Sequence, residues 1–369
     1  MDPINRLLRS LSHQEIDRPP VTSLMTAVTV EMMDRLGVKW PEAHHDSSAM
    51  ARLAAAAHET CGLESMKLPF DMTVEAGALG AKIDYGTKNT LPQVKEHPYS
   101  DPAELVVEDK WMEKARIPIV LEAIRLARNT YGEEVPVVSS IVGPFTLSCM
   151  LFGFENLFYW MLVEPKRYVV ALEIVTNLCV TYAKEQFKAG SHVVQIGEAS
   201  SSGDLISSEH YGKCVAPYQE KLCRAVEGPT VVHICGNIAG HLKYIPATGM
   251  RGISFDQKTD VREAVKQLKG RVALIGYVPT SLLLEGTPDQ VYLFSKECIR
   301  SGVDVLNAGC AWPADIPDEN VGLRGIEWVK LYLSEHTSQN LKPEIFFITK
   351  TVSSSLDNSD LVIQTFDKT

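Results

Sequence analysis

Residues 165–197 read PKRYVVALEIVTNLCVTYAKEQFKAGSHVVQIG, and they contain the two patterns that decide the fold. Across Pro165–Ala189, apolar residues recur at the spacing of one face of an amphipathic helix. These positions are Val169, Leu172, Val175 and Leu178. Gly190 is a typical helix stop signal, and the β-branched run His192–Gly197 that follows predicts a short buried strand.

Eight short β-branched runs recur along the chain, separated by longer segments with helical periodicity. They are Pro20–Leu24, Ser65–Phe70, Val135–Val142, His192–Gly197, Thr230–Cys235, Gly252–Asp256, Val272–Val278 and Val303–Gly309. Later helices are expected over Asp260–Leu268 and over Thr287–Arg300, where a capping threonine precedes a proline. Eight parallel strands that alternate with helices predict an α/β fold, the (β/α)8 TIM barrel.

We expect a single barrel domain over residues 1–333, because α/β barrels often exceed about 250 residues as one unit. Residues 334–369 are rich in Ser, Thr, Asn and Asp and form a divergent C-terminal extension, whose role the sequence does not assign. The boundary lies where the alternation of strand and helix patterns fades.

The chain has 369 residues and a formal net charge of -10, with its acidic residues scattered along the sequence. This charge argues against nucleic acid as a partner. Eight cysteines without a regular framework of spacings fit free thiols or metal ligands in a reducing cytoplasm. The stretch Met1–Arg18 lacks the apolar segment of a secretion signal, so we expect a cytoplasmic protein.

Ile141–Val163 is mostly apolar and about long enough to cross a membrane. Gly143-Pro144, Glu155 and Asn156 interrupt it and would be costly in hydrocarbon. The segment is therefore predicted to be a strand end followed by a buried or partner-facing helical segment, and no membrane is expected as a partner.

The strongest chemical signal is VVHICGN over residues 231–237. Residues two apart on a strand point to the same side, so His233 and Cys235 project together. Gly236 then lets the chain turn closely over them. In a parallel barrel, functional groups gather at the carboxyl ends of the strands, and this pair ends the fifth expected strand.

Cys310 follows the eighth expected strand in Gly309-Cys310 and lies at the same rim. A lone His-x-Cys pair is more often core packing than a metal site, but the second strand end favours a zinc ion held by His233, Cys235 and Cys310. Catalytic zinc commonly has three protein ligands and one open position. The remaining cysteines are expected to be ordinary small apolar residues: Cys61, Cys149, Cys179, Cys214, Cys223 and Cys298.

Such a zinc ion would activate a thiol. A free thiol with a pKa of about 8.5 is only about 3% ionised at pH 7, so full ionisation is worth roughly 30-fold in rate. Two cysteinates cancel the charge of Zn²⁺, so an anionic thiolate can bind without excess charge and its thioether product can leave. The metal would also position the sulfur for in-line attack on a methyl carbon.

Several polar residues at the rim are weaker candidates. Glu198 and Asp256, at the ends of the fourth and sixth expected strands, are candidates for the fourth zinc position or for substrate binding, although carboxylates there are more often supporting groups. Asn237 and Asp204 are candidates for substrate contact. Lys258 is a candidate partner for an anionic tail on the thiol, although an exposed lysine is usually solvated.

The chain resembles the uroporphyrinogen decarboxylase superfamily, and specifically its zinc methyltransferases that move a methyl group from a methylated corrinoid protein to coenzyme M. The resemblance covers about residues 1–320. It rests on Asp17–Thr22 (DRPPVT), Trp40–His44 (WPEAH), Gly86–Lys88 (GTK), Gly143-Pro144, Val232–Asn237 (VHICGN), and Asp304–Leu306 (DVL) leading to Gly309-Cys310.

The resemblance implies a (β/α)8 barrel with zinc bound by His233, Cys235 and Cys310. It also implies methylcobamide as the methyl donor and coenzyme M as the acceptor thiol. No Asp-x-His-x-x-Gly cobalamin motif is present, so a separate corrinoid protein is the expected partner. The aromatic stretch Phe152–Met161 is a candidate part of its docking surface, with core packing as the commoner alternative.

Other functions remain open from the sequence. The acceptor could be another thiol or tetrahydrofolate, or the cysteines and histidine could be structural in a binding scaffold. Asp71 resembles an aspartate of the decarboxylase branch, but that branch uses no zinc and has an arginine-rich motif where this chain reads VTSLMT over residues 21–26. The chain also departs from the coenzyme M enzymes at Tyr277 and at Gly309–Ala311, which leaves specificity open.

Overall fold

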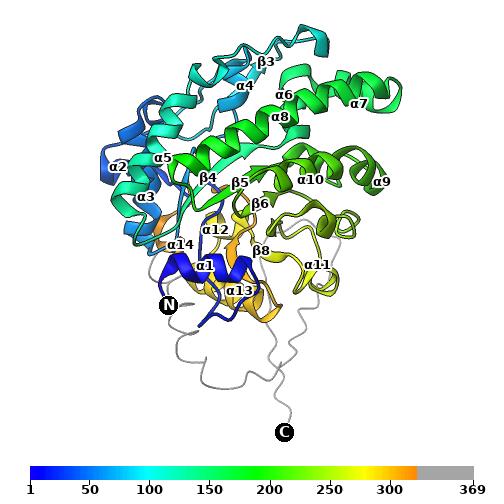
Figure 1. Ribbon diagram of the computed structural model, residues 1–369. Coiled ribbons are helices and arrows are strands. Elements are labelled where there is room, and N and C mark those ends of the chain that lie inside the picture. The colour runs from blue at the N-terminus through cyan, green and yellow to red at the C-terminus, as the bar shows by residue number, and fades with distance from the viewer. Residues whose placement is uncertain (322–369) are drawn as a thin grey trace, which may run out of the picture.

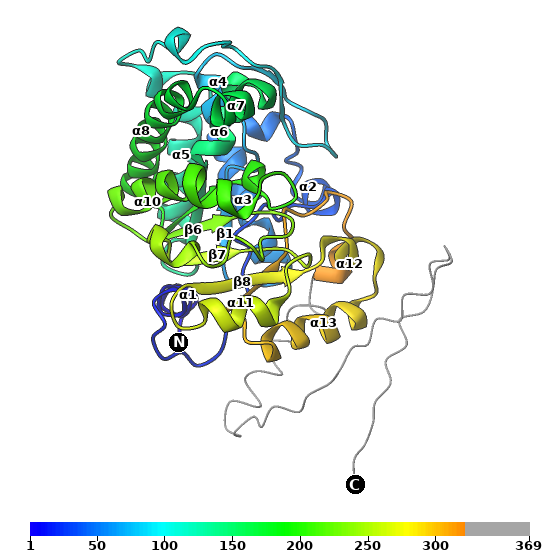
Figure 2. The same cartoon turned by 90° about the vertical axis from the view of Figure 1, so that its right-hand side faces the viewer.

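Seven parallel strands form the central sheet in residues 1–321, which are the residues that the computed structural model describes (Figures 1 and 2). In spatial order they are β1 (Met66–Leu68), β4 (Val137–Val142), β5 (Val193–Gly197), β6 (Thr230–His233), β7 (Gly252–Ser254), β8 (Ala273–Val278) and β9 (Val305–Ala308). Each strand pairs with the next strand of this series along the chain, and helices pack outside the curled sheet. The predicted TIM-barrel class of fold is confirmed.

The first expected strand, Pro20–Leu24, lies between β9 and β1 and brings the two edges of the sheet together. Val21 forms a parallel bridge with Leu306, and the backbone N–H of Leu306 donates to Pro20 at 3.0 Å. On the other side, the N–H of Glu64 donates to the Val21 carbonyl at 2.8 Å. The segment therefore occupies the position of the missing strand.

Only Val21 of that segment is bridged in a ladder, so the prediction of a full strand there was wrong. Side chains take the place of backbone partners: the N–H of Ser23 donates to Ser65 Oγ at 2.8 Å, and the N–H of Leu24 donates to Asn307 Oδ1 at 2.9 Å. A strand ladder needs backbone groups on both sides. The other seven expected runs all contain a strand, whose ends lie within two residues of the expected ends.

The helices connect and cover the strands. They are α1 (Pro3–Leu11), α2 (Val30–Leu36), α3 (Ser47–Cys61), α4 (Val74–Ala78), α5 (Ile117–Tyr131), α6 (Pro144–Phe152), α7 (Phe154–Leu162), α8 (Pro165–Ala189), α9 (Ser208–His210), α10 (Ala216–Ala225), α11 (Val261–Leu268), α12 (Thr280–Glu285), α13 (Pro288–Arg300) and α14 (Asp318–Val321). A small antiparallel hairpin, β2 (Lys82–Asp84) with β3 (Gln93–Glu96), lies between β1 and β4 along the chain. Its mostly exposed, polar residues carry no clear strand pattern.

The predicted helices follow their sequence signals. Helix α8 has the expected bounds and ends at Gly190, which has a φ of 117°. Thr287 caps α13 by accepting from the N–H of Gln290. One detail differs: Val169 is 47% exposed, because Tyr168 takes that place on the buried face of α8.

The apolar segment Ile141–Val163 comprises the end of β4, the buried helix α6 and the helix α7. Among the described residues, no single helix is long and apolar enough to cross a membrane. Helices α6 and α7 meet that test of length and composition only as a pair, and they are bent by 116° at the break between them.

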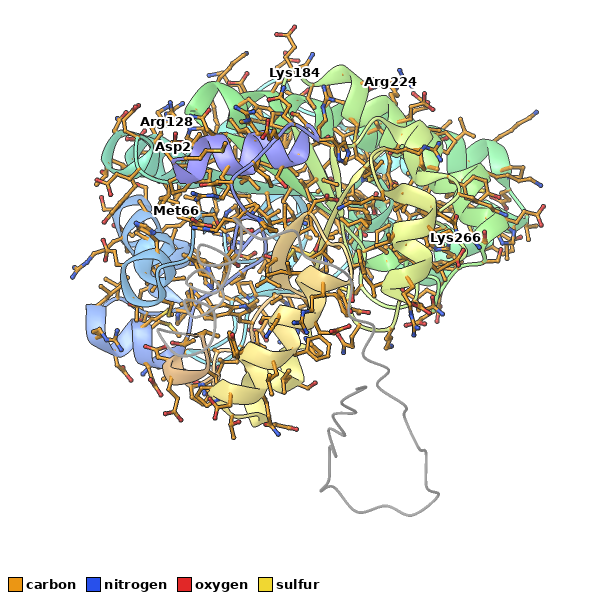
Figure 3. All side chains as sticks on the ribbon, turned by 90° about the horizontal axis from the view of Figure 1, so that it is seen from below. Asp2, Met66, Arg128, Lys184, Arg224 and Lys266 are labelled. Carbon is orange, nitrogen blue, oxygen red and sulfur yellow. The ribbon has the colours of Figure 1, made fainter. Side chains whose placement is uncertain are left out.

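The amino ends of the strands enclose an apolar plug. Val138, Val193 and Val231 point inward and pack with Leu7 and Leu11 of α1. Seen from below, α1 crosses this end of the molecule, while charged side chains such as Lys266 stand at the outer edge (Figure 3). The closed lower end leaves the opposite rim as the place where side chains from several strands meet.

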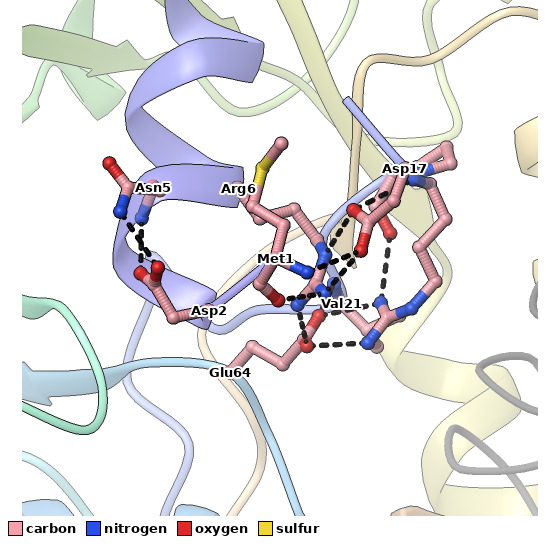
Figure 4. A network of polar contacts seen from close by, with 9 residues as sticks. Met1, Asp2, Asn5, Arg6, Asp17, Val21 and Glu64 are labelled. Carbon is pink, nitrogen blue, oxygen red and sulfur yellow. Dashed lines mark hydrogen bonds and ion pairs between the residues drawn. The ribbon is translucent and has the colours of Figure 1, made fainter. Parts of the chain in front are cut away.

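An ionic network fixes α1 and the Val21 segment to the start of β1 (Figure 4). Arg6 donates to Asp17 at 2.8 Å and to Glu64 at 2.5 Å. Glu64 also accepts from Arg18 and, at 2.9 Å, from the N–H of Val21. The buried Glu64 carboxylate thus holds the segment that joins the two sheet edges.

Candidate metal centre

The His-x-Cys pair lies where β6 ends. His233 is the last residue of β6, and its neighbours Val232 and Ile234 face the outer core, so its ring points into the barrel. Gly236 has a φ of 80°, a left-handed conformation that favours glycine and turns the chain directly after Cys235. The local sequence therefore places both donors on the inner side of the rim, as predicted.

Cys310 reaches the same place from β9. The N–H of Gly309 donates to the Val278 carbonyl at 2.7 Å, which continues the pairing of β9 with β8 for one residue. A Cβ atom at position 309 would lie 3.1 Å from the Cα of Asp256, so glycine permits the close approach of these two chains. Cys310 then turns inward toward the end of β6.

The three predicted ligand atoms converge. His233 Nε2 lies 3.0 Å from Cys235 Sγ, and Cys235 Sγ lies 3.6 Å from Cys310 Sγ. One ligand atom from each residue falls within 4.8 Å of the other two. The sulfur separation is far longer than a disulfide bond of about 2.05 Å, and both cysteines are free. One imidazole nitrogen and two sulfurs at this spacing fit the donor set of a zinc site.

Ser254 orients the imidazole. Its hydroxyl lies 3.0 Å from His233 Nδ1, and both side chains are buried. This contact leaves Nε2 toward the two sulfurs. A second hydrogen-bonding group behind a ligating histidine is a common feature of metal sites because it fixes the ring orientation.

The two thiols act on each other. Their hydrogen bond lowers the pKa of Cys310, with His233 acting in the same direction against burial. The same hydrogen bond, together with burial, raises the pKa of Cys235. Two sulfurs this close share one proton in the absence of a cation, because a second thiolate would be repelled by the first. A divalent cation would relieve that repulsion.

Asp256 supports the rim loop. Its carboxylate accepts from the N–H of Gly236 at 2.6 Å and from the N–H of Lys258 at 2.9 Å. Its carboxylate oxygens are not part of the three-donor cluster found among the described residues. Asp256 therefore holds the turn after Cys235, and its role as a fourth zinc ligand or in substrate binding stays a prediction.

The other rim candidates lie nearer to solvent. Asn237 is exposed, and its side-chain oxygen accepts from the N–H of Ala239 at 3.0 Å. Lys258 and Asp204 form an exposed ion pair at 2.9 Å. Substrate contact by any of these three residues stays a prediction.

Glu198 is fully buried against the start of α6. Its carboxylate accepts from the N–H groups of Phe145 and Thr146, at 3.2 and 3.0 Å, and from the Thr146 hydroxyl at 2.9 Å. Burial raises its pKa to about 7, against these hydrogen bonds. Glu198 is not in the cluster of converging donors within residues 1–321, and its carboxylate caps α6. Its role as a fourth zinc ligand or in substrate binding stays a prediction.

Asp71 forms a buried ion pair with Arg116. Arg116 contacts both of its oxygens, at 2.8 and 2.7 Å, and Thr73 donates to it as well. His44 Nδ1 lies 3.5 Å from the same carboxylate, and burial lowers the pKa of His44 to about 4. Direct substrate contact by Asp71 stays a prediction.

Several polar residues inside the barrel were missed by the sequence reasoning. These are Lys67, Gln195, Ser254 and Asn307. Each lies in the middle or at the end of an expected strand, on the side that faces inward. Their alternation with apolar neighbours along each run is the signal that could have indicated them.

The other six cysteines fit the expected apolar role. Five are buried, and Cys214 is half-buried. Burial raises the pKa of several of them, for example to about 12 for Cys223 and for Cys298. Such thiols stay protonated and have low reactivity.

Comparison with known proteins identifies the class. Residues 2–324 match the family Uroporphyrinogen decarboxylase (URO-D), and the chain belongs to this family. The family resemblance expected from the sequence is therefore confirmed.

Two relatives are methylcobamide:CoM methyltransferases. The chain is 34% identical over 326 residues to MtbA of Methanosarcina acetivorans, which covers 86% of this chain and 95% of that protein. It is also 34% identical over 319 residues to MtaA of Methanosarcina barkeri, covering 86% of this chain and 94% of that protein. A solved methyltransferase from Methanosarcina mazei matches with a TM-score of 0.87 at 34% identity, over 90% of this chain and 99% of that one.

Proposed function

We propose that this protein transfers a methyl group from a methylated corrinoid to the thiol of coenzyme M, at a zinc ion held by His233, Cys235 and Cys310. The observation that carries the proposal is the convergence of these three donors at the barrel rim. The names of the relatives with about 34% identity support the reaction.

The protein's own residues prepare the site. Ser254 holds the His233 ring, and Asp256 holds the turn behind Cys235. When bound, zinc would stabilise the acceptor sulfur as a thiolate and fix its position. Two cysteinates would balance the charge of the ion, so an anionic sulfur adds only one negative charge to the centre.

The proposed transfer is an in-line displacement. The acceptor sulfur gives an electron pair to the methyl carbon while the carbon–cobalt bond breaks. That bond's electron pair stays on the metal of the corrinoid, so Co(III) becomes Co(I) and a methyl thioether forms. The thiol proton leaves to solvent on binding. Positioning of the two reactants is the main contribution expected of the barrel.

The corrinoid is proposed to arrive on a separate protein that docks at the rim. The stretch Phe152–Met161 supports this role only in part, because Phe152, Leu157 and Trp160 are buried. Phe154 and Tyr159 of α7 are about half exposed, at 46% and 51%. These two side chains are the aromatic part of the stretch that is available to a partner. The cytoplasmic location stays a prediction.

The test measures metal content and loss of methylcobalamin absorbance when thiols are added, beginning with coenzyme M. About one zinc per chain with thiol-dependent demethylation is expected. Cys310→Ser should lose both while its thermal unfolding changes little, and Cys214→Ser, at a half-buried thiol outside the cluster, should retain both.

Other outcomes would change the assignment. Demethylation with a different thiol or with tetrahydrofolate, but not with coenzyme M, would replace the acceptor. If Cys310→Ser unfolds together with its loss of metal, the site is structural. Zinc that is absent and not restored by added metal would refute the proposal.

A further inference from the structure

Lys67 is a buried lysine inside the barrel. It is only 7% exposed, and its neighbours Met66 and Leu68 on β1 face the outer core, so Lys67 projects inward. Buried lysines are rare unless they are paired. Among the described residues, Lys67 has one hydrogen bond, from Nζ to the Pro69 carbonyl, and no direct ion pair with a carboxylate. An ammonium group has three donors, so this group has unused capacity.

The charges around Lys67 leave an excess of positive charge. Asp71 and Glu75 are its nearest carboxylates, but Asp71 is already bound by Arg116. Glu75 accepts from the N–H of Val142 at 2.7 Å, and burial raises its pKa to about 7. Burial lowers the pKa of Lys67 only to about 8, so it stays protonated near neutral pH. The Lys67 ammonium therefore has no carboxylate bound to it directly, while Arg116 engages Asp71.

Gln195 supplies a second unused donor. It is 3% exposed, lies on the same inward face of β5 as Val193, and its Nε2 has no hydrogen-bond partner among the described residues. A buried amide without a partner costs free energy, and such groups often receive a ligand or water.

Both donors lie on the inner wall of the barrel, below the metal centre. Lys67 pairs in register with Val138 of β4, and Gln195 pairs with Ser140, two residues further along the same strand. A Cβ atom at Gly197 would lie 3.7 Å from Gln195 Nε2 and 2.6 Å from Cε of Met72, which follows Lys67 by five residues. Gly197 is the register partner of His233 on the adjacent strand, where strands lie about 4.8 Å apart. The Met72 side chain fills the space over Gly197, so Gln195 Nε2 and the Met72 thioether both lie close to the strand position beside His233.

We propose that Lys67, together with Gln195, binds the anionic end of the acceptor thiol, with the sulfonate of coenzyme M as the ligand. The acceptor then lies with its sulfur at the cysteines and its sulfonate toward Lys67 on β1. This assignment rests on the proposed function only in placing the thiol of the acceptor at the metal centre. It makes Lys67 a specificity-determining residue, in place of the exposed Lys258 at the rim, which is paired with Asp204.

The test compares coenzyme M with 2-mercaptoethanol, which has the same thiol without the sulfonate. Binding to the zinc-loaded protein is measured by calorimetry, and kcat/KM is measured with free methylcobalamin. Lys67→Met removes the charge and keeps most of the volume. It should weaken coenzyme M about 10- to 100-fold and change 2-mercaptoethanol by less than about 3-fold, as expected for a charge-assisted hydrogen bond. Lys266→Met, on the exposed surface of α11, is the matched control and should change neither.

A second variant protects the test against misfolding. If Lys67→Met does not fold, Gln195→Met tests the proposal instead. Its binding and kcat/KM for coenzyme M alone should fall by about 3- to 10-fold, as expected for the loss of a neutral hydrogen bond. An equal loss for both thiols, or a selective loss in Lys258→Met instead, overturns the proposal.

The two proposals fail in different ways. A wild-type protein that methylates both thiols without preferring coenzyme M refutes only the role of Lys67 and Gln195. A protein that binds coenzyme M in a Lys67-dependent manner but transfers no methyl group refutes only the proposed reaction.

Discussion

The contact between Ser254 and His233 gives the sharpest prediction for the metal centre. Ser254→Ala removes one oxygen from a buried position, and the hydroxyl lies 3.0 Å from His233 Nδ1. The ring is 2% exposed and Ser254 is fully buried, so water has little access to replace the lost partner. The ring nitrogen would be left without a hydrogen bond, and the imidazole would be free to rotate.

The expected magnitude follows from that burial. Loss of a group that orients a ligating histidine typically lowers metal affinity about 10- to 100-fold, which is about 1.4 to 2.8 kcal/mol. The unpaired nitrogen should also lower the free energy of unfolding of the metal-free protein by about 1 to 3 kcal/mol. Both effects have the same cause, so they should appear together.

The assay is competition for zinc with a chromophoric chelator, combined with urea unfolding of the metal-free protein. Ser295→Ala is the matched control, because Ser295 is also a fully buried serine but its hydroxyl has no partner among the described residues. The control should keep the zinc affinity of the wild type. An unchanged zinc affinity in Ser254→Ala would show that the contact does not orient a metal ligand.

Three further predictions concern the ion pair and the packing around the site. Arg116→Met should lower the free energy of unfolding by about 3 to 5 kcal/mol in urea denaturation at pH 7, because it leaves the buried Asp71 carboxylate unpaired. Burial acts to raise the pKa of Asp71, but Arg116 holds that pKa below its usual range. The stabilisation by this ion pair should therefore be present above about pH 4 and disappear as the pH falls. A loss that is the same at pH 3 and pH 7 would contradict this origin. Burial raises the pKa of Glu75 to about 7, so the folded state should lose stability as the pH rises from about 4.5 to 7, and Glu75→Gln should show a smaller loss than the wild type when unfolding is compared at pH 5 and pH 8. Parallel pH profiles for the two proteins would exclude this effect. Gly143→Ala should lower the free energy of unfolding by about 1 to 3 kcal/mol in thermal denaturation, because the new Cβ would clash with the Glu198 side chain that caps α6. A variant as stable as the wild type would mean that the Glu198 carboxylate can move away freely.

The barrel could be predicted from the sequence because both of its periodicities are local. Strand runs and amphipathic helices can be recognised from neighbouring residues, as for α8, whose bounds match the prediction. The convergence of His233 and Cys235 with Cys310 also followed, because a closed parallel barrel brings the ends of β6 and β9 to one rim. The chemical types of these donors are those of a zinc site, and the bound ion stays a prediction.

The roles of the supporting residues needed the tertiary structure. Glu198 and Asp256 are both carboxylates after a strand, and sequence reasoning assigned them the same role. The structure separates them: one caps α6 and the other holds the turn after Cys235. Their roles depend on which loop packs against each strand end, and that choice is made by contacts between residues distant in the chain.

The same reason explains what was missed at the Val21 segment and inside the barrel. The residues determine that Val21 is apolar and that Lys67 alternates with Met66 and Leu68. Only the closed fold decides that side chains replace part of the Val21 ladder and that Lys67 and Gln195 are both buried inside the barrel. Secondary-structure patterns are set by neighbours in sequence, whereas burial, register and charge pairing across a barrel are set by residues on different strands.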